Sequence, residues 1–161
     1  MKTIKVYCII ILINCVYSPY VFSKYVEVNL NTQGYDIEVS NKHPIGFIAG
    51  KGNSRIQLID FSQSPPFEIK SITIAEKHPT VLKINPVFNE LYVIGDDTQT
   101  LYCIDISQID QYMTDSNTIS PEISFIPVGR FPSNIAVSPD GKTIFVCNLY
   151  QGMEGITVID A

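Results

Sequence analysis

One short pattern occurs three times along this 161-residue chain. A run of mostly apolar residues ends in Ile-Asp at Ile56–Asp60, at Leu101–Asp105 and again at Ile156–Asp160. The three closing aspartates are 45 and then 55 residues apart. Repeats of about this length are supersecondary units that cannot bury an apolar face alone, so each unit must pack against its neighbours.

The same register extends through the rest of each repeat. Three further sets of residues hold equivalent places: Gly34, Pro79 and Pro132 at the start; Val39, Ile84 and Val137 five residues later; and Phe47, Tyr92 and Phe145 at the opening of a second strand. Additional runs at 68–74 and 123–128 link one unit to the next. Runs of β-branched and aromatic residues separated by Gly, Pro, Asn, Asp and Ser are typical of consecutive strands.

Four strands per period describe one blade of a β-propeller. The sequence therefore predicts an all-β fold, a β-propeller of four-stranded antiparallel blades in an incomplete arc of about three blades. We place the units at about 24–66, 67–122 and 123–161, with a polar loop insertion at 108–122. A content of 45% hydrophobic and 17% charged residues fits a globular chain.

Three units are too few for a closed propeller, which typically has 4–8 blades. We expect the chain to be the N-terminal part of a longer propeller, because it ends directly after the third Val-Ile-Asp strand. Two alternatives stay open. Several copies join to close a ring, or the arc is an unstable relic with an exposed sheet edge.

The third unit resembles the YVTN type of β-propeller repeat. It reads PSNIAVSPDGK at 132–142, IFVCN at 144–148 and VID at 158–160, close to that family's strand and turn, Tyr-Val-Thr-Asn and Val-Ile-Asp segments. Asn85–Asn89 and Ser40–Pro44 replace the Ser-Pro-Asp-Gly turn in the other two units. The resemblance implies a bacterial-type exported propeller of about three repeats.

The N-terminus has the features of an export signal. MKTIK is positively charged, and 6–16 is an almost unbroken apolar run, shorter than the roughly 20 residues of a membrane span. We predict a signal peptide at 1–23 with cleavage after Ser23, and hence a periplasmic, secreted or cell-surface protein without a stable membrane span. The alternatives are an uncleaved anchor and lipid anchoring at Cys15, because Leu12–Cys15 resembles a lipobox with Asn14 in place of its small residue.

Two cysteines remain after such cleavage. Cys103 and Cys147 fall at different places in neighbouring repeats, both inside apolar strand patterns. An oxidising compartment would allow one disulfide between them. Buried free thiols that behave as small hydrophobic side chains are the other interpretation.

Several residues are of types that often act in catalysis or metal binding, but we predict structural roles for them. Pro139, Asp140 and Gly141 form a turn in which Pro fixes φ, Asp bonds its own backbone and Gly accepts a positive φ. Asp60, Asp105 and Asp160 recur once per unit, which favours hydrogen bonds to the following turn. Pro79 and Pro132 mark repeat starts. We predict no metal and no cofactor site.

The catalytic candidates are His78 and Arg130. His78 precedes Pro79 at the rim where propellers usually bind ligands, and Arg130 and Glu76 lie in the same rim loops. Such a cluster could perform acid–base or lactone chemistry, whereas ordinary polar loop ends are the simpler interpretation. His43, in a turn before Pro44, is expected to be exposed to solvent.

The sequence supports a binding module more than an enzyme. Basic residues are scattered singly and the net charge is −5, so we expect no nucleic-acid partner. The predicted function is a binding or interaction module whose rim loops contact a protein or a small molecule. The alternative is the N-terminal remnant of a propeller enzyme such as a lactonase-like hydrolase. A second copy of the chain is a further possible partner, through self-association that completes a ring.

Overall fold

The computed structural model describes residues 28, 30, 33–52, 54–74, 78–95, 98–109, 111, 121–149 and 155–161. The predicted export signal at 1–23, residue Glu76 and most of the 108–122 insertion lie outside these residues. Within them the fold is all-β, as predicted, and the strands form antiparallel sheets. No helix in this part of the chain has both the length and the apolar character needed to cross a membrane.

The strands are grouped into three sheets in chain order. The first sheet contains β1 (Gln33–Val39), β2 (Ile45–Lys51), β3 (Arg55–Asp60) and β4 (Phe67–Thr73). The second contains β5 (Pro79–Ile84), β6 (Glu90–Gly95), β7 (Thr100–Asp105) and β8 (Ile123–Pro127). The third contains β9 (Pro132–Val137), β10 (Thr143–Asn148) and β11 (Gly155–Asp160), in the order β9-β10-β11.

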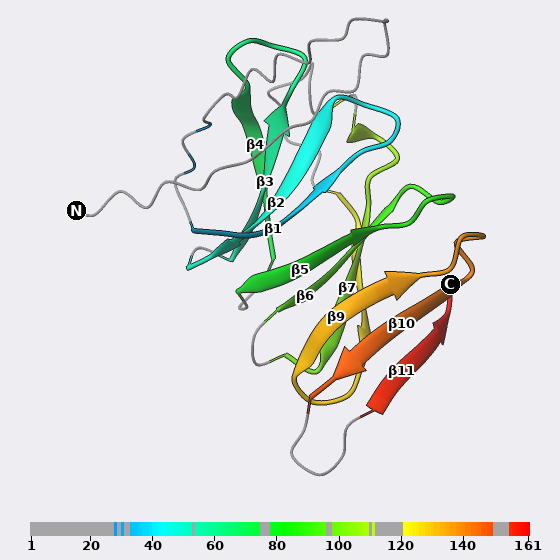
Figure 1. Cartoon of the computed structure of the whole chain (residues 1–161). Helices are drawn as coiled ribbons and strands as arrows, with labels where there is room; N and C mark the ends of the chain where they lie inside the picture. The colour runs from blue at the N-terminus through cyan, green and yellow to red at the C-terminus, as the bar shows by residue number, and fades with distance from the viewer. Residues whose placement is uncertain are drawn as a thin grey trace, which may run out of the picture.

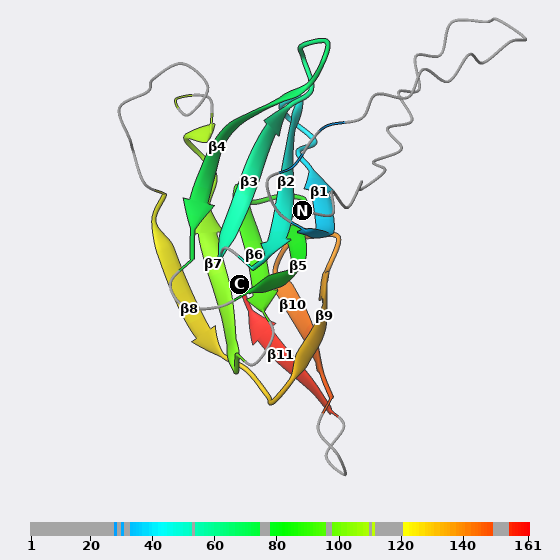
Figure 2. The same cartoon turned by 90° about the vertical axis from the view of Figure 1, so that its left-hand side faces the viewer.

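The three sheets lie next to one another in chain order. β1 contacts β5 and β5 contacts β9, so the first strands of the sheets lie side by side (Figures 1 and 2). Lys83 on β5 makes an ion pair with Glu38 on β1, with 2.7 Å between Nζ and Oε1. This is the arrangement predicted for about three consecutive blades.

The sheets observed in the structure do not end where the predicted repeat units end. The boundaries at 66/67 and 122/123 assigned the linking strands to the following unit, but β4 pairs with β3 and β8 pairs with β7. The sheets therefore end at Thr73 and Pro127. The reason is local: each linking strand runs back antiparallel to the strand before it, and the next sheet begins only at Pro79 or Pro132.

Two apolar clusters fill the spaces between the sheets. The first cluster joins Ile45, Phe47, Ala49, Ile56, Leu58, Ile72 and Ile74 of the first sheet to Leu82, Leu91, Val93, Ile104, Ile106 and Ile109. The second cluster joins Tyr92, Ile94, Leu101 and Cys103 of the second sheet to Val128, Ile135, Ile144 and Val146. Burying one large apolar side chain contributes about 1.5–3 kcal/mol. Packing between sheets therefore holds the arc together.

The two described cysteines are not joined. Cys103 and Cys147 are both free thiols, so the predicted alternative of a disulfide between them is wrong for this structure. Cys103 is buried in the second cluster, and burial raises the pKa of its thiol to about 11. Cys147 is exposed, contrary to the expectation of a buried thiol, because it lies on the outward face of the third sheet.

Candidate functional site

The strands present two ends that are chemically different. The turns 40–44, 85–89 and 138–142 lie at one end, which we call the hairpin-turn end. His78, directly before β5, and the crossing 128–131, directly before β9, lie at the other, the connection end. Because a six-residue strand is about 20 Å long, the two ends are separated by roughly that distance.

The connection end carries both candidates chosen from the sequence. His78 is exposed, and its Nδ1 accepts a hydrogen bond from the backbone N–H of Gly52 at 3.1 Å. Arg130 is also exposed, on the crossing from β8 to β9. The described contact of His78 is thus with a turn of the first sheet. Arg130 lies instead in the segment that leads into the third sheet. Pro79 and Pro132, which follow them, are buried at the first positions of β5 and β9.

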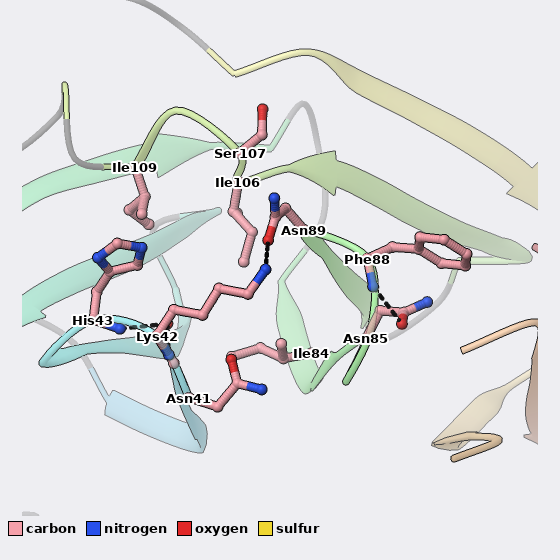
Figure 3. A pocket seen from close by; sticks show the side chains of 11 residues that line it. Asn41, Lys42, His43, Ile84, Asn85, Phe88, Asn89, Ile106, Ser107 and Ile109 are labelled. Atoms are coloured by element: carbon pink, nitrogen blue, oxygen red, sulfur yellow. Dashed lines mark hydrogen bonds between the residues drawn. The ribbon is translucent and has the colours of Figure 1, made fainter. Parts of the chain in front are cut away.

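The hairpin-turn end holds a hollow that sequence reasoning did not identify. Figure 3 shows this cavity, of about 60 Å³, between the first two sheets. The lining residues come from three separate segments: Ser40, Asn41, Lys42 and His43; Ile84, Asn85, Phe88 and Asn89; and Ile106, Ser107 and Ile109. Among the residues that the structure describes, the lining combines amides, hydroxyls, one ammonium group and one imidazole, and it includes no carboxylate.

The first wall of the hollow is a turn ordered by Ser40. Its Oγ accepts hydrogen bonds from the backbone N–H groups of Lys42 and His43, both at 3.2 Å. The turn directs the Lys42 side chain across to the second sheet, where Nζ donates to Oδ1 of Asn89 (Figure 3). His43 is half-buried rather than exposed as the sequence predicted, because it lies within this hollow.

The opposite wall is organised by Asn85, a buried polar residue with every hydrogen-bonding group of its amide used. Oδ1 accepts from the backbone N–H groups of Val87 at 2.9 Å and Phe88 at 3.0 Å. Nδ2 donates to Tyr92 Oη at 3.0 Å and to the carbonyl of Gly141 at 2.9 Å. Asn85 therefore shapes its own turn and also ties the second sheet to the third.

Tyr92 continues this network toward solvent. Its hydroxyl donates to Oε2 of Glu90 at 2.5 Å. Burial, together with the hydrogen bond to Glu90, raises the pKa of the Tyr92 phenol far above its ordinary value. The phenol thus stays protonated and keeps donating to the carboxylate throughout the physiological pH range.

Asp140 makes the contacts of a turn residue. Its Oδ1 accepts from Ser138 Oγ at 2.5 Å and from Lys142 N–H at 3.2 Å, and the Ser138 hydrogen bond is the main reason that its pKa is lowered. Gly141 has a positive φ of 74°, and a Cβ there would lie 2.5 Å from Asn85 Oδ1. Glycine is therefore required both by the turn and by the close approach of Asn85. Pro139 is exposed at the tip of the same turn.

Two of the three repeated aspartates make turn contacts. Oδ1 of Asp60 accepts from Ser62 N–H and Oδ1 of Asp105 accepts from Ser107 N–H, both at 2.7 Å. Asp160 is the last residue of β11 and lies opposite Thr143 in the sheet. Among the described residues, no group of three or more His, Cys, Asp or Glu side chains is placed to hold a metal ion.

A second, wider hollow adjoins the first. It has a volume of about 490 Å³ and shares Phe88, Asn89 and Ser107 with the smaller one. Its other lining residues are Glu90, Cys103, Asp105, Glu122 and Ser124. The hairpin-turn end therefore has a cationic side at Lys42 and an acidic side at Glu90, Asp105 and Glu122.

Comparisons with known proteins support the fold. No protein-family model matches the chain, and no curated protein sequence matches it. Among solved structures, Kuenenia stuttgartiensis hydrazine synthase is similar with a TM-score of 0.64 and 23% identity over 88% of this chain and 36% of that one. A candidate 6-phosphogluconolactonase from Bacteroides fragilis gives a TM-score of 0.61 and 11% identity over 78% and 36%.

A third structure is identified by its own name as a propeller. The Cps50 (Swd1) β-propeller domain of Myceliophteria thermophila gives a TM-score of 0.53 and 13% identity, covering 77% of this chain and 42% of that domain. The fold is thus an incomplete β-propeller, as predicted. The chain spans less than half the length of each of these three structures, and identities this low establish the fold alone.

Proposed function

We propose that this chain is an exported β-propeller repeat protein of YVTN type that acts as a binding module, and that its hairpin-turn end receives an acidic side chain of a partner protein. One observation carries this proposal. The Lys42 ammonium group lies in a preformed hollow and makes its hydrogen bond to a neutral amide, Asn89. A carboxylate entering beside Lys42 would gain a charge-assisted hydrogen bond, which is about twice as strong as a neutral one.

The size of the hollow supports a side-chain ligand. Small-molecule sites usually measure about 300–1,000 Å³, whereas this cavity of about 60 Å³ has room for a carboxylate group or a few waters. The amide of Asn41 and the imidazole of His43 line the same space and offer further donors. The export signal at 1–23 remains part of the proposal on sequence grounds.

Binding of a blocked peptide, acetyl-Gly-Glu-Gly-amide, tests this function by calorimetry with the full chain. Its glutamine counterpart controls for contacts that do not depend on charge. We expect Lys42→Gln to weaken glutamate-peptide binding at least fivefold, because the charge-assisted contact is lost. Lys142→Gln removes a lysine from the equivalent turn of the third sheet and should leave binding unchanged. Equal affinity for both peptides would refute the proposal.

The alternative is a remnant of a lactonase-like hydrolase that uses His78 and Arg130. Its support is the similarity in fold to candidate 6-phosphogluconolactonases, together with the exposure of both side chains at one end of the arc. The test is hydrolysis of δ-gluconolactone by the full chain. Hydrolysis that is lost in His78→Ala and Arg130→Ala would favour this function. Hydrolysis that both substitutions leave intact would place any activity elsewhere.

A further inference from the structure

The wider hollow at the hairpin-turn end is large enough to hold a ligand of its own. Its volume of about 490 Å³ falls within the range of about 300–1,000 Å³ that is usual for ligand sites. Phe88, Asn89 and Ser107 line both hollows, so a ligand in one reaches the edge of the other. The acidic side chain proposed for the Lys42 hollow fills only the smaller space, which leaves the wider one to be explained.

Three carboxylates meet in one row across the second sheet and line this hollow. Glu90 on β6 lies directly opposite Asp105 on β7. The backbone N–H of Asp105 donates to the carbonyl of Glu122, just before β8, at 3.0 Å. Like charges that lie directly opposite one another destabilise a sheet, and none of the three carboxylates forms an ion pair within the described part of the chain. A cation in the hollow would relieve this repulsion.

The other two sheets show that the fold does not require this acidic row. The residue in register with Glu90 is Ile45 in the first sheet and Thr143 in the third. The place of Glu122 is taken by Phe67 in the first sheet. Only the aspartate recurs in all three sheets, and in the first two it orders the following turn. Glu90 and Glu122 are therefore additions specific to the second sheet, at the mouth of its hollow.

An aromatic side chain adds a second kind of contact for a cation. Phe88 lines the wider hollow and is 43% exposed, and its ring extends away from Lys42 (Figure 3). Glu90 is held in place because its Oε2 accepts a hydrogen bond from Tyr92 Oη at 2.5 Å. A planar guanidinium group stacks on aromatic rings and pairs with carboxylates through two parallel hydrogen bonds, whereas an ammonium group acts as a point charge. This combination favours arginine over lysine.

We infer that the wider hollow is a second subsite, which receives an arginine side chain of the same partner that places an acidic side chain beside Lys42. The identity of the partner thus rests on the proposed function. Asn89, which accepts the hydrogen bond from Lys42, is directly followed by Glu90, so the two subsites are neighbours. Side chains two residues apart in an extended segment lie on one face, about 7 Å from each other. We therefore expect the partner segment to carry an acidic residue and an arginine two residues apart.

Calorimetry of the full chain with acetyl-Gly-Arg-Gly-amide tests the second subsite by itself. The citrulline counterpart has nearly the same shape without the charge, and we expect it to bind at least fivefold more weakly. Glu122→Gln should weaken binding of the arginine peptide at least threefold; the side chain of Glu122 is exposed, and its described contact in the sheet uses only the backbone carbonyl. Asp160→Asn is the matched control, because it removes a carboxylate from the equivalent row of the third sheet and should leave binding unchanged.

A linked peptide, acetyl-Glu-Gly-Arg-amide, tests whether one partner fills both subsites. It should bind at least 10-fold more tightly than either single-charge peptide, because the second contact becomes intramolecular. Lys42→Gln should leave binding of the arginine peptide intact, so a failure of the glutamate peptide alone would refute the proposed function and not the arginine subsite. Equal affinity for the arginine and citrulline peptides, equal losses in Glu122→Gln and Asp160→Asn, or no gain from linking the two charges would each overturn the inference.

Discussion

Replacing Asn85 removes a buried polar network that joins the second sheet to the third. Asn85→Ala deletes four hydrogen bonds, two of them buried, to Tyr92 Oη and to the Gly141 carbonyl. A buried group left without a partner costs about 1–3 kcal/mol, and a partly exposed one about 0.5–1 kcal/mol. Since water can replace some of the lost contacts, we expect the free energy of unfolding to fall by about 3 kcal/mol.

The assay is urea unfolding of the full chain, followed by far-ultraviolet circular dichroism because the sequence has no tryptophan. Asn89→Ala is the matched control in the same turn. Asn89 is exposed and its side chain contacts Lys42, so this change should cost about 0.5 kcal/mol or less. Equal losses of stability for the two variants would refute the role given to Asn85.

A double-mutant cycle tests the contact with Gly141. Gly141→Ala places a Cβ 2.5 Å from Asn85 Oδ1 and 2.9 Å from Val87 Cβ, at a φ of 74°. The positive φ alone costs about 1–2 kcal/mol. Because Asn85→Ala removes the clashing oxygen, Gly141→Ala should cost at least about 0.5 kcal/mol less in that background. Additive losses would show that the two residues do not meet.

Three other predictions follow from buried or paired groups. The folded state raises the pKa of Tyr92, so the contribution of its protonated phenol to stability is complete below the unfolded-state pKa near 10 and is lost as pH rises above that value. The free energy of unfolding should therefore fall less at alkaline pH in Tyr92→Phe than in the unchanged chain. Iodoacetamide at pH 8 should modify Cys147 at least 10-fold faster than Cys103, because Cys103 is buried and the pKa of its thiol is raised to about 11. Peptide mass analysis measures the two rates, and equal rates would contradict the burial of Cys103. Lys83→Ala should lower the free energy of unfolding by about 0.5 kcal/mol, less in 1 M salt, because the Lys83–Glu38 pair is partly exposed.

The repeat register predicted the strands well because each strand is specified locally. Runs such as Tyr92–Ile94 and Leu101–Asp105 contain their own apolar pattern and are bounded by turn residues. The sheet to which β4 and β8 belong was not predictable in this way. A strand pattern does not state its partner, and the antiparallel return to β3 or β7 appears only when the chain path is known.

The hollow was missed because its residues are distant in sequence. Lys42 meets Asn89, and Asn85 meets Gly141, across gaps of 47 and 56 residues that no local pattern connects. One signal was available. Asn85 follows Ile84 as Ser40 follows Val39 and Ser138 follows Val137, so each first strand is followed by a side-chain oxygen that can order the next turn.

The most direct test of the proposed function is to map where an acidic ligand binds. Backbone amide chemical shifts of the full chain, recorded with acetyl-Gly-Glu-Gly-amide and with its glutamine counterpart, locate the site residue by residue. Changes specific to the glutamate peptide should gather at Asn41, Lys42, His43 and Asn89. Changes centred on His78 and Gly129–Phe131, at the opposite end of the strands, would contradict the proposed function.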